Sequence, residues 1–534
     1  MMHPLVAAAA IQFAVAFGPS VRSEPVTGRV FVFLARDSAP EPRFQGGTLG
    51  ANAPFFGRDV SQLEPGQVAV IDASTPGFPI ARLTGIPPGD YYVQAVLSVY
   101  TEFHRADGHT IWAHMDQWEG QHPMSSPGNL VSRIKRVHVA PGAGTIRLDL
   151  TEVIPPITVP ADTKWVKHIK IQSAILTKFW NHPMYLGAVV LLPRDYDADP
   201  EQSYPVDYEQ DHFSLAPPYH FQSEDPGTVD STKQGRRAWV INLRQREGFR
   251  LYQDWTSDDF PRMLMVTFLH PTPYFDDSYA VNSANNGPYG DAIMQELIPY
   301  LESHFRIIRQ SYARVLSGGS TGGWESLALQ VQHPDFFGGA WVYYPDPVDF
   351  RQWGLVDIYS DTNAFMAPGT HWVIPERPMM RTAEGQVLIT ERQESQLEAV
   401  LGSHDRSAEQ QDAWEAVYGP VGPDGYPAPL WDKRTGVIDH EVARYMRDHG
   451  YDLTAYLREN WGRLGSQLEG KLHFYIGDMD NFYLNMAVYR LDSLLHSSAS
   501  FAYGRPAKGH GFRPTSTGEM LRVMADAIAK NAPH

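Results

Sequence analysis

The sequence predicts an α/β protein whose main domain is built on a largely parallel sheet, preceded by a small antiparallel β-sandwich. Three observations lead to this fold class. From residue 166 onward, short apolar runs typical of strands alternate with stretches of helical periodicity, the pattern of a parallel sheet. Before residue 153 the apolar runs are β-branched or aromatic and are separated by turns. Between residues 345 and 470 the alternation stops, which indicates a large insertion.

Composition and charge exclude several classes of binding partner and of catalytic site. The chain has 534 residues, enough for two or three domains, and its 43% hydrophobic and 20% charged residues are typical of a folded globular protein. The formal net charge of −17 argues against nucleic-acid or anionic-membrane partners, since both require basic surfaces. The absence of cysteine excludes disulfides, thiolate zinc sites and cysteine nucleophiles.

The N-terminus contains an apolar run, residues 5–17, that suits the core of a signal peptide and is short for a membrane span. Val21 and Ser23 are small residues at the −3 and −1 positions for cleavage before Glu24. We therefore expect residues 1–23 to be a signal peptide and the protein to be exported, either periplasmic or secreted. No Lys or Arg precedes the run, so a buried or frayed N-terminal segment is the alternative.

Residues 24–152 form the predicted β-sandwich. Its strands are expected at residues 29–34, 67–71, 91–100, 131–139 and 145–150, and in the third of these Tyr91, Val93, Ala95, Leu97 and Val99 share one face. Four histidines lie between the strands: His104, His109, His114 and His122. Their spacing matches no metal-ligand pattern, so we interpret them as solvent-facing loop residues.

A proline-rich connector at residues 153–160 marks the domain boundary, and the α/β domain follows at residues 161–534. Its strands are expected at residues 169–177, 185–192, 204–208, 263–268, 312–316, 339–343, 471–476 and 500–503, and its helices at residues 291–305, 324–332, 484–495 and 517–529.

The chemistry centres on residues 317–324, in which Gly318, Ser320 and Gly322 form a G-x-S-x-G motif. In a nucleophile elbow, such a serine occupies a strained turn between a strand and a helix, and its Oγ is exposed above the sheet. Here an apolar strand candidate precedes the motif, and a helix candidate follows it and stops before Pro334. This context favours a nucleophilic Ser320 over an ordinary glycine-rich turn.

The insertion at residues 345–470 directly follows the elbow region and is rich in Trp, Tyr, Pro and charge. Helical pieces are expected in it at residues 394–401, 413–418 and 440–447. Its position predicts a cap over the site, and the alternative is an appendage away from the chemistry.

A nucleophilic serine needs a histidine base and an acid that orients it. Asp478 and Asp480 follow the strand candidate at 471–476, where an acid should project, and His510 lies between two glycines after the last strand. The order serine, acid, histidine is that of hydrolases with a nucleophile elbow. Spacing alone does not separate Asp478 from Asp480, because alternate residues of an extended chain share a face.

From residue 166 to 529 the chain resembles the esterase family of α/β-hydrolases that includes esterase D, many feruloyl esterases and the mycolyltransferases. The resemblance rests on Tyr204-Pro-Val206, Asn282-Ser283, Gly287, the helix containing Glu296-Leu-Ile-Pro299, the elbow, Gly477-Asp-Met-Asp480 and Gly509-His510. It implies Ser320 as nucleophile, His510 as base and Asp480 as acid, with ester cleavage through an acyl-enzyme.

The resemblance also implies an oxyanion hole formed by the backbone N–H groups of Thr321 and of a residue after the first long parallel strand. Where the family commonly has His-Gly, this chain has His212-Phe213, so we place the second donor at Phe213 or Ser214.

The predicted function is hydrolysis of a carboxylic ester, on a sugar, phenolic or other small substrate, without cofactor or metal. Two alternatives stay open: an acyltransferase of the same family, and an inactive protein that binds carbohydrate or peptide. Trp341 and Tyr344, with Tyr343, are candidate substrate-binding aromatics that suit a packed core equally well. The expected partner is a small-molecule or polysaccharide-linked ester, and neither a nucleic acid nor a membrane is expected as a partner.

Overall fold

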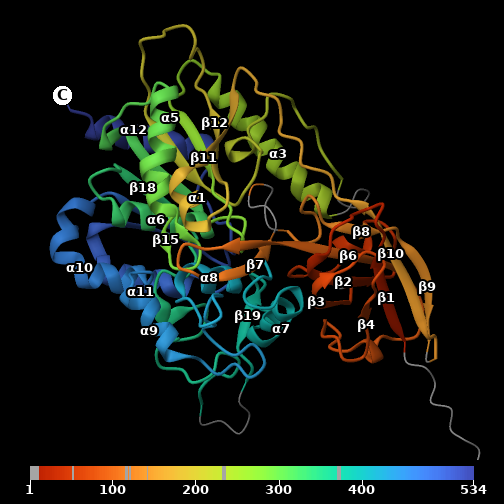
Figure 1. Cartoon of the computed structure of the whole chain (residues 1–534). Helices are drawn as coiled ribbons and strands as arrows, with labels where there is room; N and C mark the ends of the chain where they lie inside the picture. Colours follow the sequence, from red (N-terminus) through yellow and green to blue (C-terminus); the bar gives the residue numbers. More distant parts are fainter. Residues whose placement is uncertain are drawn as a thin grey trace, which may run out of the picture.

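The computed structural model describes residues 11–50, 53–114, 118, 122–140, 142–230, 236–369 and 375–533. Two large sheets organise it: an N-terminal sheet and the sheet of the α/β domain, with a mostly helical third region beside them (Figure 1). No helix in these ranges combines the length and apolarity that a membrane crossing requires.

The N-terminal strands form one hydrogen-bonded network in the order β4-β1-β10-β8-β6-β2-β3-β5, with β7 and β9 paired to β6. All five strands predicted for this region are present, with the one at 131–139 divided into β8 and β9, and the pattern missed β1, β3, β5 and β7. As predicted, Tyr91, Val93, Ala95, Leu97 and Val99 share a buried face and pack in one core. The division into two packed sheets of a sandwich stays a prediction. The strands are β1 (Gln12–Phe17), β2 (Val26–Ala35), β3 (Phe55–Leu63), β4 (Ala69–Ile71), β5 (Gly77–Phe78), β6 (Gly89–His104), β7 (Thr110–His114), β8 (Leu130–Ser132), β9 (Lys135–Val139) and β10 (Thr145–Val153).

Strand β1 occupies part of the predicted signal segment. It pairs in parallel with β10 and antiparallel with β4, and it buries Phe13, Val15 and Phe17 in the core of this sheet. The structure therefore shows the buried-segment alternative for residues 11–17, while residues 1–10 lie outside the described ranges. Cleavage before Glu24 would remove this strand, and export stays a prediction.

The second sheet has the order β11-β12-β14-β13-β17-β18-β21-β22, antiparallel across β11, β12 and β14 and parallel from there on. This mixed, mostly parallel sheet flanked by helices has the α/β architecture that the alternation of strands and helices predicted. Its strands are β11 (Val166–Ser173), β12 (Met184–Leu191), β13 (Val206–Gln210), β14 (Leu264–Leu269), β17 (Arg314–Gly319), β18 (Gly339–Tyr343), β21 (Leu472–Gly477) and β22 (Ser500–Gly504).

The first strand predicted for this domain, residues 169–177, continues past the end of β11 into the following helix. Ser173 ends β11 and caps the following helix, because its Oγ accepts a hydrogen bond from Leu176 N, 3.0 Å away. The helices of the domain are α1 (Ala174–Trp180), α3 (Arg236–Trp255), α4 (Tyr289–Ala292), α5 (Ile298–His304), α6 (Thr321–Gln332), α11 (Asn485–Leu495) and α12 (Thr517–Asn531), with a π-helical turn, η4 (Ile293–Leu297), between α4 and α5 and a small hairpin, β15 (Asn282–Ser283) and β16 (Gly287–Pro288). Helix α3 was not predicted.

The insertion lies between β18 and β21, which are neighbours in the sheet. We call residues 345–470 the cap region. It contains α7 (Glu391–Leu401), α8 (Gln410–Tyr418), α9 (His440–Asp448), α10 (Leu453–Leu468) and the hairpin β19 (Pro378–Arg381) and β20 (Val387–Thr390). The first three helices were predicted and α10 was not. Leu397, Val400 and Leu401 of α7 share a core with phenylalanines of β2 and β3, so the cap region packs against the N-terminal sheet.

Short 3₁₀ turns connect these elements: η1 (Pro42–Phe44), η2 (Leu83–Gly85), η3 (Pro218–His220), η5 (Ser311–Ala313), η6 (Phe350–Gln352) and η7 (His496–Ser498).

Candidate active site

Ser320 occupies the turn between β17 and α6. Its backbone has φ 58° and ψ −121°, a left-handed conformation that is rare for a residue with a side chain. The turn is held by Ser320 N, which donates to Tyr343 O at 3.0 Å. A strained serine between a strand and a helix at the carboxyl edge of a parallel sheet is the geometry of a nucleophile elbow.

Close packing of backbone segments around the elbow requires glycine at positions 318 and 322. A Cβ on Gly318 would lie 2.3 Å from the carbonyl oxygen of Gly322, and one on Gly322 would lie 2.0 Å from the carbonyl oxygen of Gln210 at the end of β13. Neither position admits a side chain unless the backbone moves. The G-x-S-x-G spacing therefore has a steric cause here.

Asp480 and His510 are brought together by the loops that follow β21 and β22. Asp480 is fully buried, and its Oδ1 accepts hydrogen bonds from the N–H groups of Phe482 (2.9 Å) and Leu484 (3.3 Å). Its Oδ2 lies 2.8 Å from Nδ1 of His510. A carboxylate at Nδ1 holds the ring proton there and leaves Nε2 free to accept a proton.

Neighbouring residues hold the His510 loop in place. Asn481 Oδ1 accepts a hydrogen bond from His510 N at 2.8 Å, and Asp478 Oδ1 accepts one from Lys508 N at 3.0 Å. The imidazole lies between the rings of Tyr344 and Phe482, with centroids 4.6 and 5.0 Å away. Asp478 thus binds loop backbone and Asp480 binds the histidine. The role of Asn481 was not predicted.

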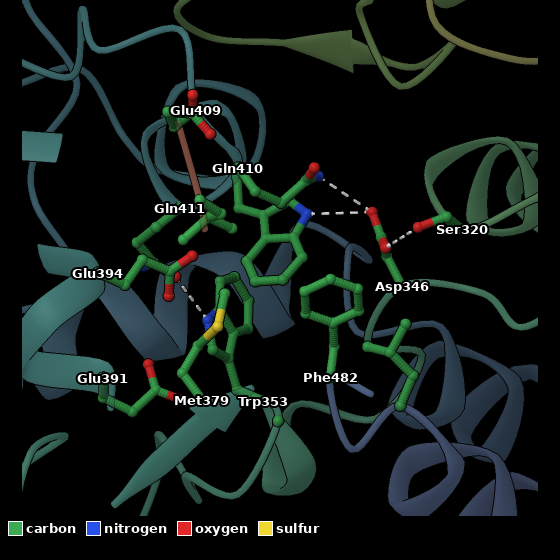
Figure 2. Close-up of a pocket in the computed structure, with 14 residues that line it drawn as sticks. Ser320, Asp346, Trp353, Met379, Glu391, Glu394, Glu409, Gln410, Gln411 and Phe482 are labelled. Atoms are coloured by element: carbon green, nitrogen blue, oxygen red, sulfur yellow. Dashed lines mark hydrogen bonds between the residues drawn. The ribbon is translucent and has the colours of Figure 1, made fainter. Parts of the chain in front are cut away.

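Ser320 Oγ points toward Asp346 rather than His510. It donates to Asp346 Oδ1 at 3.3 Å (Figure 2), and in the described part of the chain no hydrogen bond joins Ser320 to His510. Tyr344 lies beside both segments: its ring contacts His510, and its hydroxyl is 2.5 Å from where a Cβ on Gly319, the residue before Ser320, would be. Serine and histidine are therefore at the same edge of the sheet without a direct bond.

Asp346, three residues after β18, was missed by the sequence analysis. It is 3% exposed, and its Oδ2 accepts hydrogen bonds from Tyr279 (2.7 Å), Thr321 (3.0 Å), Gln410 (3.1 Å) and Trp414 (3.4 Å). Burial raises its pKa above the ordinary value, although the bonds from Tyr279 and Thr321 oppose this. The only available signal was its place in a loop at the carboxyl edge of the sheet, which does not distinguish it from other loop carboxylates.

Comparison with known proteins bears directly on this site. Residues 184–416, which include Ser320 and end before Asp480 and His510, match the family model described as "Esterase: Putative esterase". The chain carries an esterase domain. Its enzymatic class is accordingly that of a carboxylic ester hydrolase.

Several solved structures are similar to the esterase domain. A ferulic acid esterase aligns at 13% identity over 68% of this chain and 98% of its own, with a TM-score of 0.37. An S-formylglutathione hydrolase from Agrobacterium tumefaciens aligns at 11% identity over 69% and 96%, with a TM-score of 0.33. A ferulic acid esterase from Anaeromyces mucronatus aligns at 12% identity over 69% and 93%, with a TM-score of 0.29. No curated protein matches the chain in sequence.

The predicted oxyanion donors of the esterase domain lie at the ends of β13 and β17. Thr321 is the first residue of α6, where a backbone N–H has no acceptor within the helix and the helix dipole favours negative charge. Phe213 follows β13, and its ring packs edge-on against Trp118 at 5.6 Å. The adjacent His212 anchors this loop, since its Nδ1 lies 3.0 Å from carboxylate oxygens of both Asp276 and Asp277.

A cavity of about 140 Å³ opens beside Ser320 (Figure 2). Most of its walls come from the cap region. That this region is a cap that controls access to Ser320 stays a prediction. The lining residues are Leu49, Ser320, Asp346, Trp353, Gly354, Met379, Glu391, Glu394, Glu409, Gln410, Gln411, Trp414, Phe482 and Leu484.

The prediction of Trp341 as a substrate-binding residue is wrong in this structure. Side chains alternate along β18, so Ala340 and Val342 face one core while Trp341 and Tyr343 face the other, on the α12 side of the sheet. Trp341 is 2% exposed and stacks on His473 at 4.6 Å. Tyr344 does lie at the site, against His510 rather than among the residues that line the cavity.

Metal-ligating groups occur in two places within the described ranges. One is His212 with Asp276 and Asp277, and the other is Asp405 with Asp412 and Glu415, where the ammonium group of Lys433 contacts both aspartates. None of the four histidines His104, His109, His114 and His122 belongs to either group. His114 is buried, which is contrary to a solvent-facing loop residue, and burial lowers its pKa to about 3.

Proposed function

We propose that the protein is a serine esterase in which Ser320 is the nucleophile, His510 the general base and Asp480 the acid that orients it. The observation that carries this proposal is the Asp480–His510 contact of 2.8 Å, on loops at the same sheet edge as the strained elbow of Ser320. These three groups supply the roles that acyl transfer requires: a nucleophile, a base and a fixed tautomer.

In this mechanism Ser320 Oγ turns from Asp346 to Nε2 of His510, because a free enzyme often tightens its catalytic hydrogen bonds only when substrate is bound. It then attacks the ester carbonyl while His510 takes its proton. The N–H groups of Thr321 and Phe213 stabilise the oxyanion, and one such donor contributes about 3 kcal/mol. His510 next protonates the departing alcohol, and water hydrolyses the acyl-enzyme by the reverse sequence.

The substrate is a small carboxylic ester with one part in the cavity under the cap region. A sugar or phenolic ester is compatible with this space, and the similar solved structures named above include ferulic acid esterases. Export to the periplasm or the exterior is part of the proposal, and it rests on the N-terminal sequence alone.

The test is Ser320→Ala assayed with p-nitrophenyl acetate. Because alanine fits the elbow, the variant should keep its thermal midpoint and lose at least about a thousandfold in kcat/KM, as triad variants do. Ser493→Ala, at an exposed serine of α11, is the matched control and should be fully active. A Ser320→Ala enzyme with more than about a thousandth of the normal rate would rule out the serine mechanism.

A further inference from the structure

The cavity beside Ser320 is lined by carboxyl groups that lack partners. Glu391 and Glu394, in the first turn of α7, are 4% and 6% exposed, and Glu409 immediately precedes α8 (Figure 2). No hydrogen bond from any described residue reaches these three carboxyl groups. Buried carboxyl groups are ordinarily paired or hydrogen-bonded, so the open ones of Glu391 and Glu394, with the half-buried Glu409 at the same cavity, call for a ligand.

The nearest cationic side chains are already occupied. Arg377, whose charge opposes the rise that burial causes in the pKa of Glu391, forms an ion pair of 2.9 Å with Asp361. Lys433, whose charge opposes the same rise in the pKa of Glu394, lies 3.3 Å from Glu398. Among the described residues that line the cavity there is no Lys, Arg or His. The described lining of the cavity therefore offers these glutamates no cationic partner.

Three other residues that line the cavity are aromatic. The rings of Trp353 and Trp414 meet edge to face at 4.9 Å, and Phe482 also lines the cavity. The indole N–H groups are used elsewhere, in Trp353 by Gln411 at 2.9 Å and in Trp414 by Tyr279 at 2.6 Å. Aromatic rings together with open carboxylates bind organic ammonium groups, through cation–π attraction and charge.

A metal ion is a poorer fit to these groups. The two described clusters whose oxygen or nitrogen ligands lie within 4.8 Å of one another do not include Glu391, Glu394 or Glu409. Their ligand oxygens therefore do not all lie within 4.8 Å of one another, as the ligands of one small ion would.

We propose that this cavity selects esters in which the acyl or the alcohol part carries a permanent positive charge, such as a quaternary ammonium group. The inference rests on the proposed ester hydrolysis at Ser320 and names its substrate class. The cationic group binds between the glutamates and the tryptophans and places the ester carbonyl at Ser320.

The experiment compares two pairs of esters that differ only in a nitrogen cation and its carbon isostere. On the alcohol side these are acetylcholine and 3,3-dimethylbutyl acetate. On the acyl side they are the p-nitrophenyl esters of 4-(trimethylammonio)butyrate and 5,5-dimethylhexanoate. In at least one pair, kcat/KM for the cationic ester should exceed that of the neutral ester by about tenfold or more, which is the size of a desolvated cation–π contact with charge.

Variants of the glutamates test which side chains cause the preference for cationic esters. Glu394→Gln and Glu391→Gln should bring the cationic-to-neutral ratio toward one, whereas Glu441→Gln, at an exposed position of α9, should leave the ratio at the wild-type value. The thermal midpoint of each variant shows that it is folded, and the wild-type ratio tests the proposal even if a variant is not.

The outcomes separate this inference from the proposed function. Equal kcat/KM within both pairs, or a preference for 6-O-acetylglucose over acetylcholine, would overturn the cationic selectivity while Ser320-dependent hydrolysis stood. Absence of hydrolysis of every ester would overturn both.

Discussion

At the scale of single residues, function depends on which carboxylate faces which partner. Asp480 is hydrogen-bonded to His510, Asp346 to Ser320, and Asp478 to the backbone of the histidine loop. All three are aspartates in loops after neighbouring strands, and their chemistry differs only through these contacts. Their amide variants should therefore behave differently.

We expect Asp480→Asn to lower kcat by about 10⁴ with little change in KM, because the amide keeps the shape but does not hold the imidazole tautomer. Asp478→Asn should cost far less, since an amide oxygen can still accept the hydrogen bond from Lys508 N. Steady-state kinetics on p-nitrophenyl acetate separate the two. The reverse ranking would assign the acid role to Asp478.

At the scale of elements, the cap region determines what reaches Ser320. Helix α7 begins with a capping box, in which the side chains of Thr390 and Gln393 each accept a hydrogen bond from the other residue's backbone N–H. These bonds fix the turn that carries Glu391 and Glu394. Helix α8 adds Gln410, Gln411 and Trp414 to the cavity wall. Two helix starts thus converge on one cavity.

This arrangement predicts a pH dependence of selectivity. Burial raises the pKa of Glu391 and of Glu409 to about 8, so in the empty enzyme both are largely protonated below that pH. A bound cation stabilises the ionised forms and releases protons, so cation affinity should rise as pH increases toward 8 and level off above it. The charged groups that act on these two glutamates are Arg377, Glu394, Glu398, Asp276 and His212.

The measurement is the ratio of kcat/KM for acetylcholine to that for 3,3-dimethylbutyl acetate between pH 6 and pH 9. A pH effect on the acyl-transfer step itself is common to both esters and cancels in the ratio, and the quaternary ammonium keeps its charge throughout. We expect the ratio to increase several-fold over this range. A flat ratio would show that the glutamates do not bind the cation.

At the scale of the whole molecule, the N-terminal sheet supports the cap region (Figure 1). Arg29 of β2 is 4% exposed and donates to the carbonyl oxygens of Ala399 (3.2 Å) and Val400 (2.9 Å), which are at the C-terminal end of α7. It also pairs with Asp59 at 2.6 Å. The last carbonyls of a helix have no partner within it, so this arginine caps α7 from another domain.

Replacing Arg29 should therefore affect both stability and the site. We expect Arg29→Ala to lower the free energy of unfolding by about 3 kcal/mol, because it leaves the two carbonyls at the end of α7 without their donor and removes one of the two arginine partners of Asp59. Thermal or denaturant unfolding measures this. Arg147→Ala, an exposed pair with Asp149 on β10, is the control and should be near neutral. Equal stability of the two variants would show that the contact between the domains is not stabilising.

Much of the main sheet could be predicted from the sequence, as residues 339–343 show. Their apolar run predicted a strand with the bounds that β18 has, because a buried strand between turns leaves a local pattern. The same pattern did not show which face Trp341 occupies, since both faces of a central parallel strand are buried. Helix α3 was missed because its mixed charged and apolar sequence lacks a clear stripe.

Residues 5–17, near the N-terminus, show what a local sequence pattern does not predict. An apolar run of this length is compatible with a signal-peptide core and with a buried strand, and only the pairing of β1 with β4 and β10 shows the strand. In that pairing Gln12 lies beside Thr145, which is distant in the sequence, so a local sequence pattern does not predict it.

The sequence by itself determined the α/β class, the elbow at Ser320, the candidates Asp480 and His510, and the presence of an insertion before β21. These depend on short-range constraints: strand and helix periodicity, glycines where the backbone is crowded, and chain order. Only the tertiary structure decided that Asp346 faces Ser320 and that Glu391, Glu394 and Glu409 line one cavity. The cause is physical, because those carboxyl groups acquire their environment from segments that meet only when the cap region folds onto the sheet.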